Sequence, residues 1–100
     1  SATSLTTSQG TLVPGYSLIR KAITATEGFS TGTLADGDSG QILTILITEV
    51  EEGGTFTLTP SRKTGFTSLV FEAVGDLATL LYVNDTLGWI IISQESVQKI

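Results

Sequence analysis

The stretch that decides the fold reads GFTSLVFEAVGDLATLLYVNDTLGWIIIS over residues 65–93. Its β-branched and aromatic side chains, which favour a pleated and half-buried surface, fall into three runs at residues 67–72, 78–83 and 89–93. A Gly-Asp pair separates the first two runs, and the polar segment 84–88 separates the last two. We predict three strands, with the last two joined as a β-hairpin by a longer loop. Trp89 should anchor the core, with its indole N–H bound to a partner.

Two further runs precede this stretch. Residues 41–49 have one wholly apolar face and one mixed face, which predicts a central strand that is nearly buried on both sides. Residues 55–60 alternate cleanly, with Phe56 and Leu58 facing inward and the threonines outward. Pro60 has no N–H to donate, so it either ends this strand or keeps it at a sheet edge.

The N-terminal part of the chain is harder to interpret. Residues 1–15 are rich in Ser and Thr, and only Leu5, Leu12 and Val13 could pack. We expect an extended arm that either lacks fixed structure or docks on a neighbouring subunit, with these three residues as its capsid contacts. Residues 16–100 would then form a single β domain. Its first segment, 16–26, fits a short helix or an irregular strand, and we favour the strand because its surroundings are β.

The whole pattern amounts to six to eight short strands about ten residues apart, with turn signals between them. It predicts an all-β domain, an antiparallel β-sandwich or a jelly-roll-like fold, with a small barrel as the alternative. The chain shows no internal repeat of roughly twenty residues or more, which disfavours a solenoid.

Composition excludes several classes of function. The chain has 100 residues, of which 15% are charged, with 5 Lys and Arg against 10 Asp and Glu. It therefore lacks the basic stripe that nucleic acids require, and its acidity argues against anionic membranes. The longest apolar runs have strand length, too short to cross a bilayer. The low charge leaves faces that other subunits can bury without desolvating many ions.

The basic residues occur mainly as two pairs, Arg20-Lys21 and Arg62-Lys63. We expect both pairs to be solvated turn or edge charges, with salt bridges to another subunit as the alternative.

Catalytic constellations are hard to build from this chain. It contains no His and no Cys, so a Ser-His-Asp or Cys-His arrangement is impossible. Ser96 and Lys99 match a Ser-x-x-Lys pattern, but they lie in the terminal tail rather than at a buried helix start. The acidic residues Glu49, Glu51 and Glu52 flank a turn, where a solvated cluster is expected rather than a glycosidase pair. We expect no cofactor.

Asp36 and Asp38 open a segment, DGDSG, that is similar to the start of a calcium loop. The EF-hand pattern requires a bidentate Glu at its twelfth position, and this chain has Ile47 there. Asp and Gly also favour tight turns for backbone reasons. We therefore favour a structural turn and leave a cation site as the alternative.

The aromatic residues have two possible roles. Tyr16, Phe29 and Tyr82 could bind a sugar if they were exposed, but packing in the core or between subunits is the preferred interpretation. The residues for which we expect such packing are Phe56, Leu58, Phe71, Leu80, Tyr82 and Trp89.

Four segments together resemble small β-domains of tailed-phage virion proteins. They are DGDSGQILTI (36–45), GGTFTLTP (53–60), GFTSLVF (65–71) and GDLATLLYVNDTLGWII (75–91). The pieces are turns between strands, so their order and spacing carry the resemblance, which covers residues 36–92. Marine and cyanobacterial phages carry such domains in capsid decoration (cement) proteins and in fibre or head-fibre proteins.

The resemblance implies a non-enzymatic, multimeric β-module. The function expected from it is that of a decoration protein on the capsid exterior, which forms a homotrimer, binds the major capsid protein and stabilises the shell. The alternative is a fibre or receptor-binding module that recognises carbohydrate on the host surface. Neither function involves nucleic acid or a membrane.

Overall fold

This computed structural model describes residues 4–7, 11–12, 18–23, 31–51 and 53–100. These residues contain ten strands and no helix. The strands are β1 (Ser4–Thr7), β2 (Thr11–Leu12), β3 (Leu18–Ile23), β4 (Thr31–Leu34), β5 (Gln41–Val50), β6 (Phe56–Pro60), β7 (Leu69–Phe71), β8 (Leu77–Tyr82), β9 (Trp89–Glu95) and β10 (Gln98–Lys99). The all-β prediction is confirmed.

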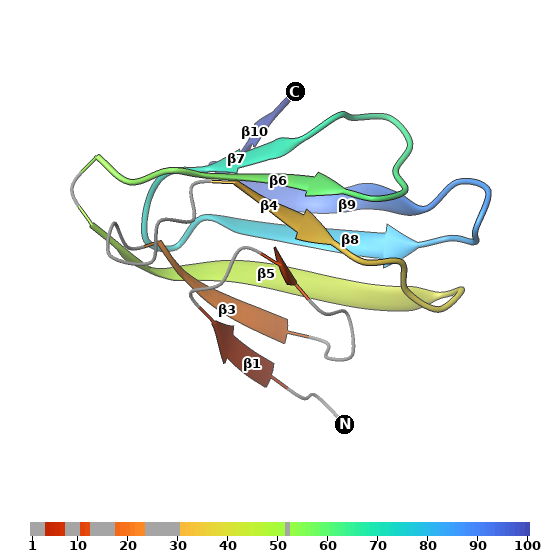
Figure 1. Cartoon of the computed structure of the whole chain (residues 1–100), viewed down its shortest axis with the longest axis horizontal. Coiled ribbons are helices and arrows are strands. Elements are labelled where there is room, and N and C mark those ends of the chain that lie inside the picture. Colours follow the sequence, from red (N-terminus) through yellow and green to blue (C-terminus); the bar gives the residue numbers. More distant parts are fainter. Residues whose placement is uncertain (1–3, 8–10, 13–17, 24–30, 52) are drawn as a thin grey trace.

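The strands form two five-stranded sheets that pack as a sandwich (Figure 1). Sheet A has the order β1-β3-β5-β8-β9, and sheet B has the order β10-β7-β6-β4-β2. The sequence predicted antiparallel sheets, but both sheets are mixed, with parallel as well as antiparallel pairs. β1, β3 and β5 run parallel to one another, as do β2, β4 and β6, whereas β7 to β10 pair antiparallel with their neighbours.

The parallel pairs follow from the path of the chain. From β1 to β6, each successive strand lies in the opposite sheet, so the chain returns to a sheet only after crossing the other one. It re-enters in its former direction, and the strand two places later therefore pairs parallel with the earlier one.

The predicted strands lie close to where the sequence placed them. The hairpin of β8 and β9 is present, and the uncertain segment 16–26 contains the strand β3. Pro60 ends β6 but does not lie at an edge, because β6 pairs with β7 on one side and β4 on the other. β5 is central, but it is buried on one face only: Leu43, Ile45 and Ile47 point into the core, whereas Ile42 is 51% exposed.

The segment predicted as an N-terminal arm contributes β1 and β2 to the sheets of its own chain. β1 pairs with β3, and β2 pairs with β4. Leu5 lies opposite Ile19 in this register, and Leu12 lies opposite Leu34. Val13 falls outside the described residues. Both short strands are at sheet edges, so they leave one backbone side without a partner strand in their sheet.

The core lies between the two sheets. All six residues for which packing was expected, Phe56, Leu58, Phe71, Leu80, Tyr82 and Trp89, are fully buried within the single chain. Phe56 and Phe71 face each other from adjacent strands, with ring centroids 6.1 Å apart. Tyr82 and Trp89 meet edge to face at 5.1 Å, an arrangement that aromatic rings favour.

Lys21 corrects the expectation that both basic pairs are solvated. Its side chain is fully buried because β3 points Ile19, Lys21 and Ile23 to the same inner face. The ammonium Nζ donates to the carbonyl of Ala22 at 2.8 Å and lies 4.7 Å from the centroid of the Phe56 ring. A carbonyl and an aromatic face are both favourable surroundings for a cation, so the charge has partners inside the sandwich.

Substituting one residue on each face of β6 tests the orientation of the strand. Leu58→Ala removes a fully buried side chain and should lower the free energy of unfolding by about 2–5 kcal/mol. Thr57→Ala, on the opposite face, should cost less than about 1 kcal/mol. Urea denaturation followed by the fluorescence of Trp89 measures both. Equal losses for the two variants would contradict the orientation described.

Candidate functional site

Three loops meet at one end of the sandwich: residues 35–40, 61–68 and 83–88 (Figure 1, right). A set of polar side chains that we call the loop-end network joins them, formed by Asp36, Ser61, Arg62, Tyr82 and Asp85. Arg62 connects all three loops, because its Nε donates to Asp36 Oδ2 at 2.7 Å and its second nitrogen Nη1 donates to the carbonyl of Asp85 at 2.5 Å. The Ser61 hydroxyl donates to the other oxygen of Asp36 at 2.7 Å.

Trp89 lies directly beneath this network. Its indole N–H donates to the carbonyl of Ala35 at 3.1 Å, as the sequence predicted. Its backbone N–H donates to the carbonyl of Arg62, and its own carbonyl accepts from the N–H of Thr64. The residue before it, Gly88, has a φ of +70°, and a Cβ there would collide with the backbone of Arg62. Glycine is required at this position both for its conformation and for the close approach of the two loops.

The network shifts the pKa values of three of its members. The hydrogen bond to Asp36 and the negative charge of that carboxylate raise the pKa of Arg62 above its ordinary value. The other two members are Asp36 and Tyr82. The hydrogen bond from Ser61, assisted by the Arg62 guanidinium, lowers the pKa of Asp36 below its ordinary value of 3.8, although burial acts in the opposite direction. The hydrogen bond from the Tyr82 hydroxyl to Asp85, together with burial, raises the pKa of Tyr82 to about 12. Both groups are held in their neutral-pH charge states by partners within the network, a structural arrangement rather than a proton-transfer one.

The cation site considered for Asp36 and Asp38 does not form as a ligand cluster. Both oxygens of Asp36 are bound to Ser61 and Arg62, and the backbone of Asp38 forms a turn with Gln41. Within the described ranges, no group of three or more His, Asp or Glu residues is placed to hold a metal ion. The geometry supports the structural turn.

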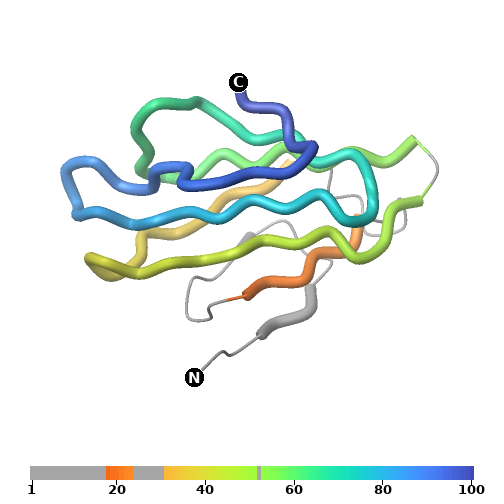
Figure 2. Tube along the Cα trace, turned by 180° about the vertical axis from the view of Figure 1, so that it is seen from behind, coloured from red at the N-terminus to blue at the C-terminus, as the bar shows by residue number. Residues whose placement is uncertain are grey.

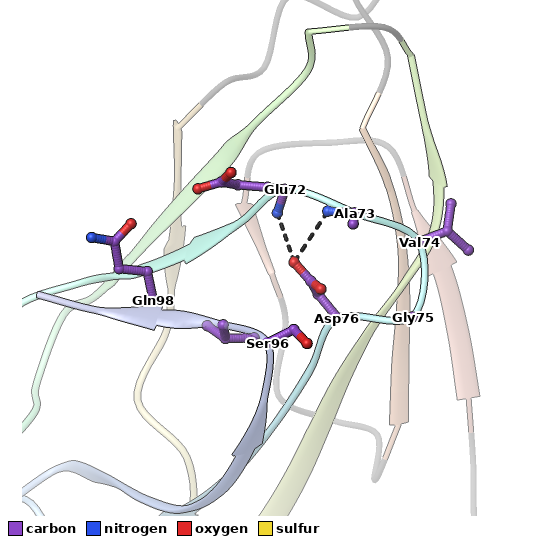
Figure 3. A pocket seen from close by; sticks show the side chains of 8 residues that line it. Glu72, Ala73, Val74, Gly75, Asp76, Ser96 and Gln98 are labelled. Carbon is purple, nitrogen blue, oxygen red and sulfur yellow. Dashed lines mark hydrogen bonds between the residues drawn. The ribbon is translucent and has the colours of Figure 1, made fainter.

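A shallow pocket of about 620 Å³ lies at the opposite end of the sandwich (Figure 3). Two turns enclose it, the β7–β8 turn at Glu72–Asp76 and the β9–β10 turn at residues 96–98. Asp76 is only 3% exposed, and its Oδ2 accepts from the backbone N–H groups of Glu72 at 2.8 Å and Ala73 at 3.1 Å. Its carboxylate is therefore used to close the turn, as Figure 3 shows.

The two residues of the Ser-x-x-Lys pattern line different hollows: Ser96 lines this pocket, and Lys99 lines a separate groove. Ser96 has a φ of +60° in the turn before β10, and Lys99 is the last residue of β10. Neither belongs to a helix, so the arrangement in which a lysine one helical turn away activates a serine is absent from these two residues. Of the acidic cluster, Glu49 lies on β5 and Glu51 follows the strand, while Glu52 falls outside the described residues.

The aromatic residues considered for sugar binding are not displayed by the described part of the chain. Tyr82 is fully buried, and Tyr16 and Phe29 fall outside the described residues. Among the described aromatic side chains, only Phe66 is less than fully buried. It lines a small groove of about 210 Å³ with Ile91 and Lys99, beside β9, which is the last strand of sheet A.

Sequence reasoning missed the two residues that organise the ends of the sandwich. Arg62 is an exposed loop charge, as the sequence predicted, but the sequence did not indicate that it joins three loops. For Asp76, the sequence indicated only a position within a turn. The two hydrogen-bond partners of Arg62 lie 26 and 23 residues away in the sequence, too far for a local sequence pattern to indicate them. For Asp76, the signal was the Gly-Asp pair itself, because Asp side chains commonly bind backbone N–H groups in turns.

The lowered pKa of Asp36 predicts a pH-dependent contribution to stability. A carboxyl whose pKa is lower in the folded state stabilises the fold above its unfolded value, near 3.8, and the contribution is lost as pH falls through the lower folded value. Asp36→Asn should therefore destabilise the protein at neutral pH, and the difference from the wild type should shrink in acid. The midpoints of urea denaturation of both proteins, at neutral pH and at a pH below the folded pKa of Asp36, measure this difference in stability. Asp38→Asn, whose side chain lies outside the network, is the matched control, and a pH-independent loss in Asp36→Asn would contradict the prediction.

The raised pKa of Tyr82 predicts late ionisation. The neutral phenol should stabilise the fold below its ordinary pKa of 10.0, and that contribution should be lost as pH rises toward about 12. The phenolate absorbance of the wild type, minus that of Tyr82→Phe, isolates this group from Tyr16. Asp85→Asn should move the transition toward its ordinary value. A Tyr82 transition already at its ordinary value in the wild type would show that the hydrogen bond to Asp85 does not persist in solution.

The described residues contain no helix with the length and hydropathy needed to span a bilayer. No protein-family model matches the chain, and a search of curated proteins likewise returned no match. The site is therefore interpreted from its own geometry.

Proposed function

We propose that this protein is a non-enzymatic capsid decoration (cement) protein that binds the exterior of a phage shell. In this proposal it contacts the major capsid protein and bridges neighbouring capsomers. Many weak contacts repeated by the symmetry of the shell would then stabilise the shell through avidity. The resemblance of residues 36–92 to such domains implies a trimeric or otherwise multimeric assembly, and we propose a homotrimer.

The observation that carries the proposal is a β-sandwich that displays apolar side chains on its surface. Among the residues that the structure describes, the large hydrophobic ones that are more than a third exposed are Ile42, Val74, Leu87, Ile92 and Ile100. Leu87 lies on the loop-end network's third loop, and Val74 lies at the opposite end. Exposed apolar groups on a surface with few charges are suited to burial against other proteins.

The carboxylates at the ends of the sandwich are already engaged in hydrogen bonds within the chain, which supports a binding role over catalysis. The chain has no His or Cys. The carboxylates of Asp36, Asp76 and Asp85 each accept hydrogen bonds that hold a loop or turn. A catalytic carboxylate would instead be directed at a substrate position with a pKa matched to its task.

Binding to shells tests the proposal. Expanded empty heads from a panel of tailed phages, cyanophages included, should bind the protein in a saturable way at a fixed ratio to the major capsid protein, and bound heads should melt at a higher temperature. Leu87→Asp and Val74→Asp place a charge at either end of the sandwich, and the variant at the end that faces the shell should lose binding by about tenfold or more. Thr86→Asp is the matched control for Leu87→Asp.

The outcomes separate the competing functions. Failure to bind any head, or binding that does not saturate, would count against decoration. Binding to a glycan array instead of heads would establish the fibre or receptor-binding alternative. Turnover of a glycoside or ester substrate would refute the non-enzymatic part of the proposal.

A further inference from the structure

The outer face of sheet A is unusually apolar for a surface that faces away from the core. Figure 2 views the molecule from behind Figure 1, with β5, β8 and β9 side by side. The apolar residues that alternate with the buried ones on these strands are Ile42, Leu46, Leu77, Leu81 and Ile90. Each is half-buried or exposed. An alternating strand with one solvated face would normally place polar residues there.

The register arranges these side chains in rows across the strands. One row runs Ile42, Leu81, Ile90, and it is entirely apolar. A second row runs Arg20, Leu46, Leu77, Glu95. Between them lies a row of Leu18, Thr44, Thr79 and Ser93. Cross-strand neighbours on one face of a sheet are in contact, so each row is a continuous strip.

The polar groups at the centre of this face already satisfy each other. The hydroxyls of Thr44 and Thr79 lie 3.1 Å apart in a hydrogen bond. A hydroxyl with a partner costs less to remove from water than one without. The middle of the face can therefore be covered by another surface at little cost in hydrogen bonding.

The charges of the second row stand at its two ends with opposite signs. Arg20 lies on β3 and Glu95 on β9, with two strands between them. Three strand spacings separate them by about 14 Å, too far for a contact within one chain. The row therefore has a cation at one end, two leucines in the middle and an anion at the other end. If a second copy of the row lies against it in the reverse order, each cation faces an anion and each leucine faces a leucine.

We propose that a second copy of this chain covers the outer face of sheet A, related by a two-fold axis that runs parallel to the strands between β5 and β8. This rotation reverses each row on the opposing copy. Arg20 of one copy then faces Glu95 of the other, and the reverse pair forms at the other end. Leu46 faces Leu77, and Ile42 faces Leu81, so apolar groups meet apolar groups. Such an interface is isologous, as in most symmetric dimers.

This inference does not rest on the decoration function. A two-fold contact gives assemblies with an even number of copies. It is compatible with the proposed homotrimer only if three-fold contacts elsewhere combine with it into a hexamer. Solution mass tests it without any shell, and shell binding tests the decoration function separately.

Charge reversal provides a sharp test, using light scattering over a range of concentrations on the full chain. Arg20→Glu and Glu95→Arg each place like charges opposite one another twice, and each should weaken association by roughly tenfold. The double variant restores opposite charges and should recover association. Lys99→Glu, on sheet B, is the matched control and should leave the mass unchanged. Leu46→Glu buries a charge at the centre and should leave only single chains.

Each outcome decides the question. An even number of copies, weakened by either reversal and recovered by the double variant, would support the interface. A mass of one or three copies at every concentration would overturn it. An even assembly in which the double variant remains as weak as the single ones would overturn the pairing of Arg20 with Glu95, and with it the proposed axis. Circular dichroism confirms that each variant is folded.

Discussion

The rest of this structure depends on the packing and hydrogen bonding of Trp89 at the junction of the two sheets. The residue begins β9 in sheet A, yet its backbone exchanges hydrogen bonds with the loop that leaves β6 in sheet B. Its ring packs edge to face on Tyr82, and its indole N–H binds the loop between β4 and β5. One buried side chain thus fixes the spacing of the sheets and the position of three loops. The ion pair of Arg62 and Asp36 lies above it and is partly solvated, so it orients the loops more than it stabilises them.

Much of the fold could be predicted because its determinants are local. The alternation in β6 and the apolar runs in β8 and β9 can be recognised from neighbouring residues alone, and the structure contains these strands. The partner of the Trp89 indole was expected from chemistry, since a buried N–H needs an acceptor. What local pattern could not supply was which strands pair. The parallel pairing of β3 with β5 and of β4 with β6 depends on the path of the chain between sheets, which no single segment encodes.

The candidate site shows the same division. The turn at Asp36 was expected, but not that its carboxylate would be occupied by Ser61 and Arg62 from a loop 25 and 26 residues later. Lys21 was misjudged because its charge outweighed its position in the strand. Alternation places it on the inner face with Ile19 and Ile23, and a carbonyl and an aromatic ring accept it there. Strand period was the better guide than residue class at this position.

The winding of the first six strands also sets an order in time. None of the strands β1 to β5 can pair with the next strand to be synthesised, because that strand belongs to the other sheet. β3 can pair only after β5 has been synthesised, and β4 only after β6, and each pairing closes a long loop. The hairpins β6–β7 and β8–β9 close over short loops and can form early. Folding is therefore expected to begin in the C-terminal half, which then serves as the template on which the N-terminal strands settle last.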